Sequence, residues 1–179
     1  MQPNDYAVQL PAGDEPGASA GRPVHADDPS VLLSRHFQAV WQAGAAELAP
    51  VNPALQVEAI GFVRYAGDWV GVVVTPWFFK LFLLPGGGSL WGDIPAGQRR
   101  YLELPGGVLP FTAETAPAVG PYQCTPLIEP IAAVSSMGVA RQAALDALRA
   151  AFALEVAAPP AATSDNPRRG FLRLLGGRR

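Results

Sequence analysis

The stretch Trp69-Val-Gly-Val-Val-Val-Thr-Pro-Trp-Phe-Phe-Lys-Leu-Phe-Leu-Leu-Pro85 is the most apolar part of the chain. It is shorter than a membrane span, which needs about 20 apolar residues, and Lys80 interrupts it. Residues 70–74 and 78–84 are mostly β-branched, aromatic or leucine, which predicts two strands covered on both faces. Because Pro76 has no N–H to donate, we expect a sharp bend at Thr75-Pro76-Trp77. We interpret the stretch as the core of a sheet and a candidate floor for a binding groove.

The composition sets limits on what the protein does. A length of 179 residues with 49% hydrophobic content indicates one domain with a real core. A net charge of −2 argues against nucleic acid as a partner. The single Cys124 excludes an internal disulfide framework and favours a reducing compartment. Since residues 1–28 lack a basic region followed by an apolar one, we predict a cytoplasmic protein without stable membrane insertion.

Three regions differ in composition. Residues 1–27 are rich in Pro, Gly, Ala and Asp, which predicts a disordered N-terminal tail with His25 in solvent. Residues 28–156 carry the periodic apolar patterns of a folded α+β domain. Residues 157–179 form a linker and then a basic-apolar C-terminal tail.

Two helices are predicted near the ends of the domain. Asp28-Pro29 is a helix start, with an N-cap acid followed by proline at the first helical position. This helix should end near Ala49, because Pro50 follows. The second helix is predicted from Met137 to Leu154, capped by Ser135 or Ser136.

Between the helices, turn residues separate short apolar runs that predict strands at 56–65, 70–74, 78–84, 100–104, 108–115 and 122–128. Gly106-Gly107 predicts a tight turn, Pro110 predicts an interrupted, edge-like strand, and residues 85–89 predict a flexible connection. The expected fold is α+β, with an antiparallel meandering sheet of about five or six strands flanked by both helices.

Catalytic and metal-binding motifs are absent from the sequence. There is no paired Cys or His at metal-ligand spacing, no nucleophile elbow and no dinucleotide fingerprint. Cys124 lies on a predicted strand, where a small core residue is a simpler interpretation than a nucleophile. The sequence therefore predicts no cofactor and favours a binding or assembly protein over an enzyme.

The C-terminal tail contains Arg168-Arg169-Gly170-Phe171-Leu172-Arg173, which resembles the twin-arginine export motif. Only six residues follow Arg173, so no hydrophobic export segment accompanies it. Two interpretations remain: a solvated basic tail, or a short amphipathic segment that touches anionic lipid.

Several segments together resemble the HybE family of [NiFe]-hydrogenase assembly chaperones. These are Val74-Thr75-Pro76-Trp77-Phe78, Leu83-Leu84-Pro85-Gly86, Leu90-Trp91, Leu104-Pro105-Gly106-Gly107, Pro110-Phe111-Thr112, Gly120-Pro121-Tyr122, Pro126-Leu127 and Arg168-Arg169. The resemblance covers residues 30–179. It implies a non-catalytic chaperone that binds the small-subunit precursor carrying a twin-arginine signal, in some members also the large subunit, and delays export until assembly is complete.

A receptor for such a signal needs an apolar groove or sheet edge with acids nearby. On this reasoning the predicted client-binding residues are Trp69, Thr75, Pro76, Trp77, Phe78 and Trp91, with Glu58, Asp68 or Asp93 meeting the arginines. Arg168, Arg169, Phe171 and Leu172 form the tail motif, which we expect to dock in the same groove when no client is present. The alternative function is a small-molecule or lipid-binding domain with a tail that touches the membrane peripherally.

Overall fold

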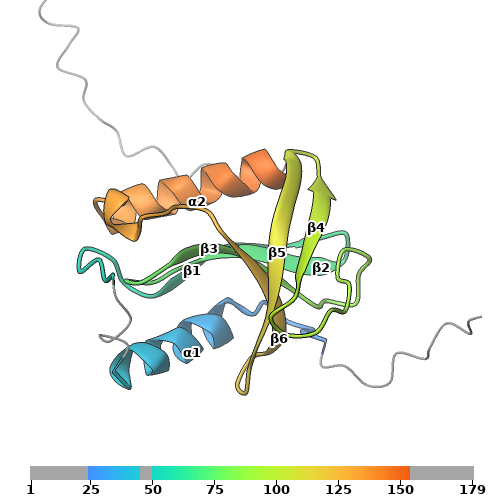
Figure 1. Ribbon diagram of the computed structural model, residues 1–179, viewed down its shortest axis with the longest axis horizontal. Helices are drawn as coiled ribbons and strands as arrows, with labels where there is room; N and C mark the ends of the chain where they lie inside the picture. The colour runs from blue at the N-terminus through green and yellow to red at the C-terminus, as the bar shows by residue number, and fades with distance from the viewer. Residues whose placement is uncertain (1–23, 45–49, 154–179) are drawn as a thin grey trace, which may run out of the picture.

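Two helices cover opposite faces of a six-stranded antiparallel sheet (Figure 1). The structure is a computed structural model that describes residues 24–44 and 50–153. The elements in chain order are α1 (Ser30–Gln42), β1 (Glu58–Tyr65), β2 (Asp68–Val74), β3 (Phe79–Leu84), β4 (Arg99–Leu104), β5 (Gly107–Ala116), β6 (Gly120–Pro126), the short 3-10 helix η2 (Ile131–Ala133) and α2 (Met137–Phe152). The expected α+β fold is confirmed.

The sheet order is β1-β2-β3-β6-β5-β4. The chain forms two consecutive three-stranded meanders, and antiparallel pairing of β3 with β6 joins them. Figure 1 shows β4 and β5 inclined steeply to β1–β3, as the twist of a sheet requires. The joining pair, in which Lys80 is opposite Pro126 and Leu81 opposite Thr125, brings the opening stretch beside residues more than 40 positions away.

Each face of the sheet has its own hydrophobic core. The first is the α2-side core, where Val70, Val72, Leu81 and Leu83 pack with Leu148 and Phe152 of α2. The second is the α1-side core, where Val73, Phe82 and Leu84 pack with Leu33 and Phe37 of α1. Because successive strand residues point to opposite faces, strands buried on both sides must be apolar at nearly every position. This explains the nearly continuous apolar run of the opening stretch.

The helix starts agree with the sequence to within a residue, but the helix ends do not. The Asp28 carboxylate accepts the Ser30 N–H at 2.8 Å, and the Ser136 hydroxyl accepts the Val139 N–H at 3.3 Å. The first helix ends at Gln42 rather than near Ala49, so that prediction is wrong. Gly44 follows in a left-handed conformation with φ of 111°, which terminates the helix before the prolines are reached. Residues 45–49 lie outside the described part. The second helix ends at Phe152 rather than at Leu154, because Ala153 takes a left-handed conformation with φ of 50°.

Two strand predictions are also corrected. The turn between β4 and β5 consists of Pro105 and Gly106, and Gly107 already belongs to β5. The strand around Pro110 is not interrupted, because β5 is continuous and lies between β4 and β6 in the sheet order. Pairing with β6 starts only at Thr112, so Pro110 lies where β5 has a neighbour on one side alone. A missing N–H is tolerated at such a position.

The glycine-rich loop after β3 is held in place rather than flexible. The carboxylate of Asp68 is fully buried and accepts backbone N–H groups from Gly86 at 2.8 Å, Gly88 at 3.0 Å, Leu90 at 2.9 Å and Trp91 at 2.7 Å. Glycine is needed at position 88, because a Cβ there would collide with the backbone of residues 66–68. The expected flexible connection is therefore a rigid, side-chain-anchored loop.

Candidate binding surface

The bend between β2 and β3 is built around the buried hydroxyl of Thr75. This oxygen accepts the N–H groups of Trp77 at 3.2 Å and Phe78 at 2.9 Å, and the Thr75 N–H donates to the Phe78 carbonyl at 2.9 Å. Such a side-chain-stabilised turn replaces the ladder bonds that Pro76 cannot make. It leaves the rings of Trp77 and Phe78 half-buried at the end of the sheet.

Aromatic rings from α1 support this bend. The Trp77 ring stacks on Trp41 with centroids 5.6 Å apart and an interplanar angle of 9°. Phe78 meets Phe37 edge-on at 5.1 Å. These contacts fix the orientation of the two exposed ring faces, since offset and edge-on aromatic pairs have definite geometry.

A buried asparagine links the bend to the segment before α2. The backbone N–H of Asn52 donates to the Pro76 carbonyl at 2.6 Å. Its side-chain amide donates to the carbonyls of Ile131 at 3.0 Å and Val134 at 2.7 Å. Between these segments lies an open pocket of about 220 Å³, which we call the junction pocket, lined by Pro50, Trp77, Phe78, Phe79, Lys80, Pro126, Ile128, Glu129, Pro130 and Ile131.

One wall of the junction pocket continues into a polar cluster on the sheet. Lys80 from β3 lies 3.3 Å from Glu114 Oε1 of β5, and it also lies 5.1 Å from the centre of the Phe78 ring. Glu114 accepts from the hydroxyl of Tyr122 at 2.9 Å and from the thiol of Cys124 at 3.2 Å. The sequence did not predict this cluster. The only signal for the cluster was a lysine within an apolar strand.

The protonation states in the cluster follow from burial and charge. Burial acts to raise the pKa of Glu114, but the Lys80 charge and the hydrogen bonds from Tyr122, Cys124 and Lys80 together lower it. Burial first, and then the Glu114 charge, raises the pKa of Tyr122. Burial is also the main cause that raises the pKa of Cys124 to about 12. A protonated thiol that is almost fully buried is a poor nucleophile.

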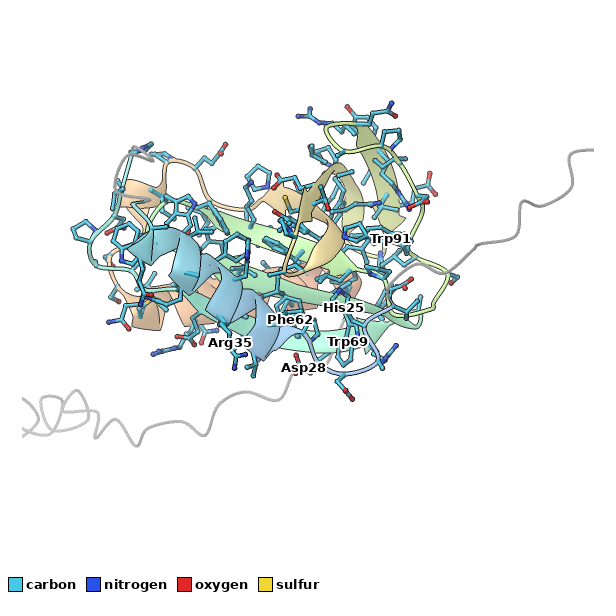
Figure 2. The ribbon with its side chains drawn as sticks, turned by 90° about the horizontal axis from the view of Figure 1, so that it is seen from below. His25, Asp28, Arg35, Phe62, Trp69 and Trp91 are labelled. Atoms are coloured by element: carbon cyan, nitrogen blue, oxygen red, sulfur yellow. The ribbon has the colours of Figure 1, made fainter. Side chains whose placement is uncertain are left out.

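The six predicted client-binding residues do not form one surface. Thr75, Pro76, Trp77 and Phe78 belong to the bend, whereas Trp69 lies at the opposite end of β2, about 20 Å away at strand spacing. Trp69 donates its indole N–H to the His25 carbonyl at 2.8 Å, and Figure 2 shows these two residues side by side. Trp91 packs on the α2-side core, whereas Trp77 packs on the α1-side core.

Glu58 and Asp68, which were suggested for binding arginines, are already engaged. Glu58 binds Arg141 of α2 through three hydrogen bonds of 2.8, 2.9 and 3.2 Å, and Asp68 anchors the glycine-rich loop. The expectation that His25 is solvated is also wrong. The Nε2 atom of its side chain is buried, and its backbone N–H donates to the Pro85 carbonyl at 2.9 Å.

Residues 24–44 and 50–153 contain neither a candidate metal site nor a candidate membrane-spanning helix. No three His, Cys, Asp or Glu side chains there are grouped to hold a metal ion. None of the helices in these residues is long and apolar enough to cross a bilayer. The tail residues Arg168, Arg169, Phe171 and Leu172 lie outside the described residues.

Residues 28–174 match the model of the family described as "[NiFe]-hydrogenase assembly, chaperone, HybE". The chain belongs to the HybE family. The resemblance noted from the Thr-Pro-Trp bend and its companion segments is therefore confirmed, and it extends over both helices, the sheet and most of the tail.

Named relatives agree with this family. The Hydrogenase-2 operon protein HybE of Escherichia coli K12 is 27% identical over 151 residues, which is 84% of this chain and 90% of that protein. Protein HoxT of Cupriavidus necator is 31% identical over 153 residues, 78% of this chain and 85% of that protein. The Probable rubredoxin HupJ of Rhodobacter capsulatus is 33% identical over 121 residues, 67% of this chain, and the match spans only 44% of that longer protein.

A solved structure shares the fold. The solution structure of HybE from Escherichia coli superposes with a TM-score of 0.61 at 25% identity, covering 87% of this chain and 93% of that one. The fold and the HybE family assignment therefore rest on both sequence and structure.

Proposed function

We propose that this HybE-family protein is a non-catalytic, cytoplasmic chaperone that binds the twin-arginine-signal-bearing precursor of a [NiFe]-hydrogenase small subunit and delays its export until assembly is complete. The large subunit is a second partner on this proposal. The observation that carries it is the family match over residues 28–174.

The junction pocket suits part of a signal segment. A signal of this kind is an extended chain in which arginines precede apolar residues. Trp77, Phe78 and Ile128 offer an apolar wall, and their surfaces are only half-buried. Glu129 is exposed on the rim and has no ion-pair partner within the described residues, so it is available to a client arginine. The charge of Lys80 does not oppose this, because Glu114 compensates it.

The polar side chains beside the junction pocket are engaged with one another, which favours a binding role. The buried thiol of Cys124 is held protonated, and the Lys80–Glu114 pair is engaged in the sheet. The junction pocket does not favour the alternative of a small-molecule or lipid-binding domain, because its volume of about 220 Å³ is below the roughly 300 Å³ at which ligand sites usually begin. Open pockets of about 330 Å³ lie beside Trp91 and beside Trp41.

The proposal is tested by titrating a small-subunit signal peptide into the full chain in a calorimeter. Trp77→Ala should weaken binding at least about tenfold, because a central aromatic anchor contributes well over 1 kcal/mol. Trp69→Ala is the matched control, since it removes an indole of similar exposure at the far end of β2. Equal losses in both variants would place the client elsewhere, and no binding by the unaltered chain would reject the proposal.

Capture of the partner in cells provides the second test. Affinity-tagged chain expressed in hydrogen-oxidising cells should retain a small-subunit precursor whose signal is uncleaved, as mass spectrometry of the signal region would show. Recovery of only the processed small subunit, or of neither subunit, would contradict a role before export.

A further inference from the structure

A two-stranded arm projects from the sheet next to the end of α2. It consists of β4 and residues 107–111 of β5, which pair with β4 before β5 begins to pair with β6. On one face of the arm Leu102, Leu104 and Phe111 enter the α2-side core. At the arm's tip the Gly106 N–H donates to the Ala151 carbonyl at 3.1 Å, so the tip rests on the last turn of α2 (Figure 1).

The other face of the arm presents apolar side chains to solvent. Tyr101 is 68% exposed and Val108 is 58% exposed. Tyr101 is paired with Pro110 and Glu103 with Val108, so the four side chains adjoin, and Tyr101 and Val108 are diagonal neighbours about 7–8 Å apart. We call Tyr101, Glu103, Val108 and Pro110 the arm patch.

The arm patch carries negative charge near its tip. Glu103 is exposed and makes no ion pair with any described residue. Arg99 lies at the opposite end of β4, where it is paired with Thr112. A ligand that fits the patch therefore has apolar side chains for Val108 and Pro110 and a cation for Glu103 and the Tyr101 ring.

We propose that the arm patch is the docking surface of the chain's own segment Arg168–Leu175. The segment has the required chemistry, with Arg168 and Arg169 close to Phe171 and Leu172. The family model matches the chain as far as residue 174, so all of this segment except Leu175 lies within the matched region. The inference does not depend on client binding, and it places the tail away from the junction pocket.

The described chain ends close enough to the arm for the segment Arg168–Leu175 to reach the arm patch. α2 ends at Phe152, beside the tip of the arm, and 14 residues separate Ala153 from Arg168. Fourteen residues reach at most about 50 Å, which exceeds the length of the arm, about 17 Å for five residues. Tethering then provides an effective concentration on the order of millimolar, which is enough to populate a weak contact.

Paramagnetic labelling tests the docking. A nitroxide is attached to the full chain through Gly176→Cys, and Cys124 stays unlabelled because its thiol is buried. The expected result is broadening of the amide signals of Tyr101, Glu103 and Val108, at least threefold greater than that of Val31 on α1. Deleting residues 168–179 should shift the same three amide signals in the unlabelled protein.

Exposed-surface variants separate docking from loss of folding. Tyr101→Ser with Val108→Ser should abolish the broadening, whereas Val31→Ser, which changes an even more exposed valine on α1, should leave it unchanged. Broadening centred on Trp77 would overturn the proposal in favour of self-occlusion of the junction pocket. Broadening seen only between a labelled and an unlabelled chain would assign the patch to a second copy, and no broadening would reject docking altogether.

Discussion

At the scale of single residues, Asp68 is the most constrained side chain. Its two carboxylate oxygens accept four backbone N–H groups in the interior, and no neutral side chain of the same shape has that acceptor capacity. Arg100 lies close enough for the Asp68 charge to act on it, and it donates to the Leu90 carbonyl at 2.9 Å. One residue thus orders the loop after β3.

Asp68→Asn is expected to destabilise the fold by about 3 kcal/mol. The amide replaces one acceptor oxygen with a donor, so two of the four loop N–H groups lose their partner and face an N–H₂ group instead. Urea unfolding followed by tryptophan fluorescence measures the change. Asp146→Asn is the control, because that exposed carboxylate binds Gln142 and Arg149 on the surface of α2, and its loss should stay below about 0.5 kcal/mol.

Glu114 gives the stability a defined dependence on pH. Its pKa in the folded state is below the ordinary value of 4.5, so the native state binds the proton less tightly than the unfolded state. The stabilisation is therefore present above pH 4.5 and is lost as the pH falls through the folded-state pKa. Because the side chain is 39% exposed, solvent reduces the size of the effect.

Glu114→Gln should cost about 1 kcal/mol at pH 7, since the amide keeps one acceptor but loses the ion pair with Lys80. The difference from the unaltered chain should shrink between pH 5 and pH 3, as measured by urea midpoints. A difference that is constant over this range would show that the carboxylate charge does not stabilise the fold. Glu103→Gln, on the exposed face of β4, is the matched control and should show little effect at either pH.

At the scale of elements, the bend between β2 and β3 depends on a hydroxyl. Thr75→Val keeps the shape of the side chain but leaves the N–H groups of Trp77 and Phe78 without their acceptor. We expect a loss of about 1–3 kcal/mol in unfolding free energy, together with weaker binding of a signal peptide. Thr75→Ser keeps the hydroxyl and should restore most of both. If Thr75→Val binds the peptide normally, the bend is not the client surface.

The sequence predicted these elements where local chemistry determines them. Runs of β-branched and aromatic residues located the strands, and Ser136 located the start of α2. One failure was local, because Gly44 ends α1 before Pro50 through its own left-handed conformation. The other was tertiary: β5 is an inner strand, yet Pro110 has a neighbour on one side alone because β6 pairs with β5 only from Thr112 onwards. Neither outcome is encoded in the spacing of apolar residues.

At the scale of the whole molecule, the sheet order determines which residues meet. Pairing of β3 with β6 brings Lys80 to the strand that carries Tyr122 and Cys124, and Glu114 follows on β5. No pattern along the chain shows that β6 inserts between β3 and β5. The bend was therefore predictable as a family marker, whereas the polar cluster beside it and the separation of Trp69 and Trp91 from Trp77 were not.

Long-range contacts also determine where the folded domain begins. Residues before α1 are tied to the far end of the sheet through backbone carbonyls. Arg64 donates to His25 at 3.2 Å and to Ala26 at 2.7 Å, and the Trp69 indole donates to His25 at 2.8 Å. The Arg64 guanidinium also lies 4.6 Å from the Trp69 ring centre. A boundary at residue 28, as composition suggested, would separate this segment from its partners.

Two truncations locate that boundary. A chain starting at Val24 keeps all these contacts and should unfold within about 0.5 kcal/mol of the full chain. A chain starting at Asp28 loses the three carbonyl contacts and the His25–Pro85 hydrogen bond, and should lose about 2–4 kcal/mol, at about 1 kcal/mol for each bond. Urea unfolding of both chains measures the difference. Equal stability would mean that hydrogen bonds from Arg64 and Trp69 to water replace those to the carbonyls without loss of stability. The domain would then begin with the Asp28 cap.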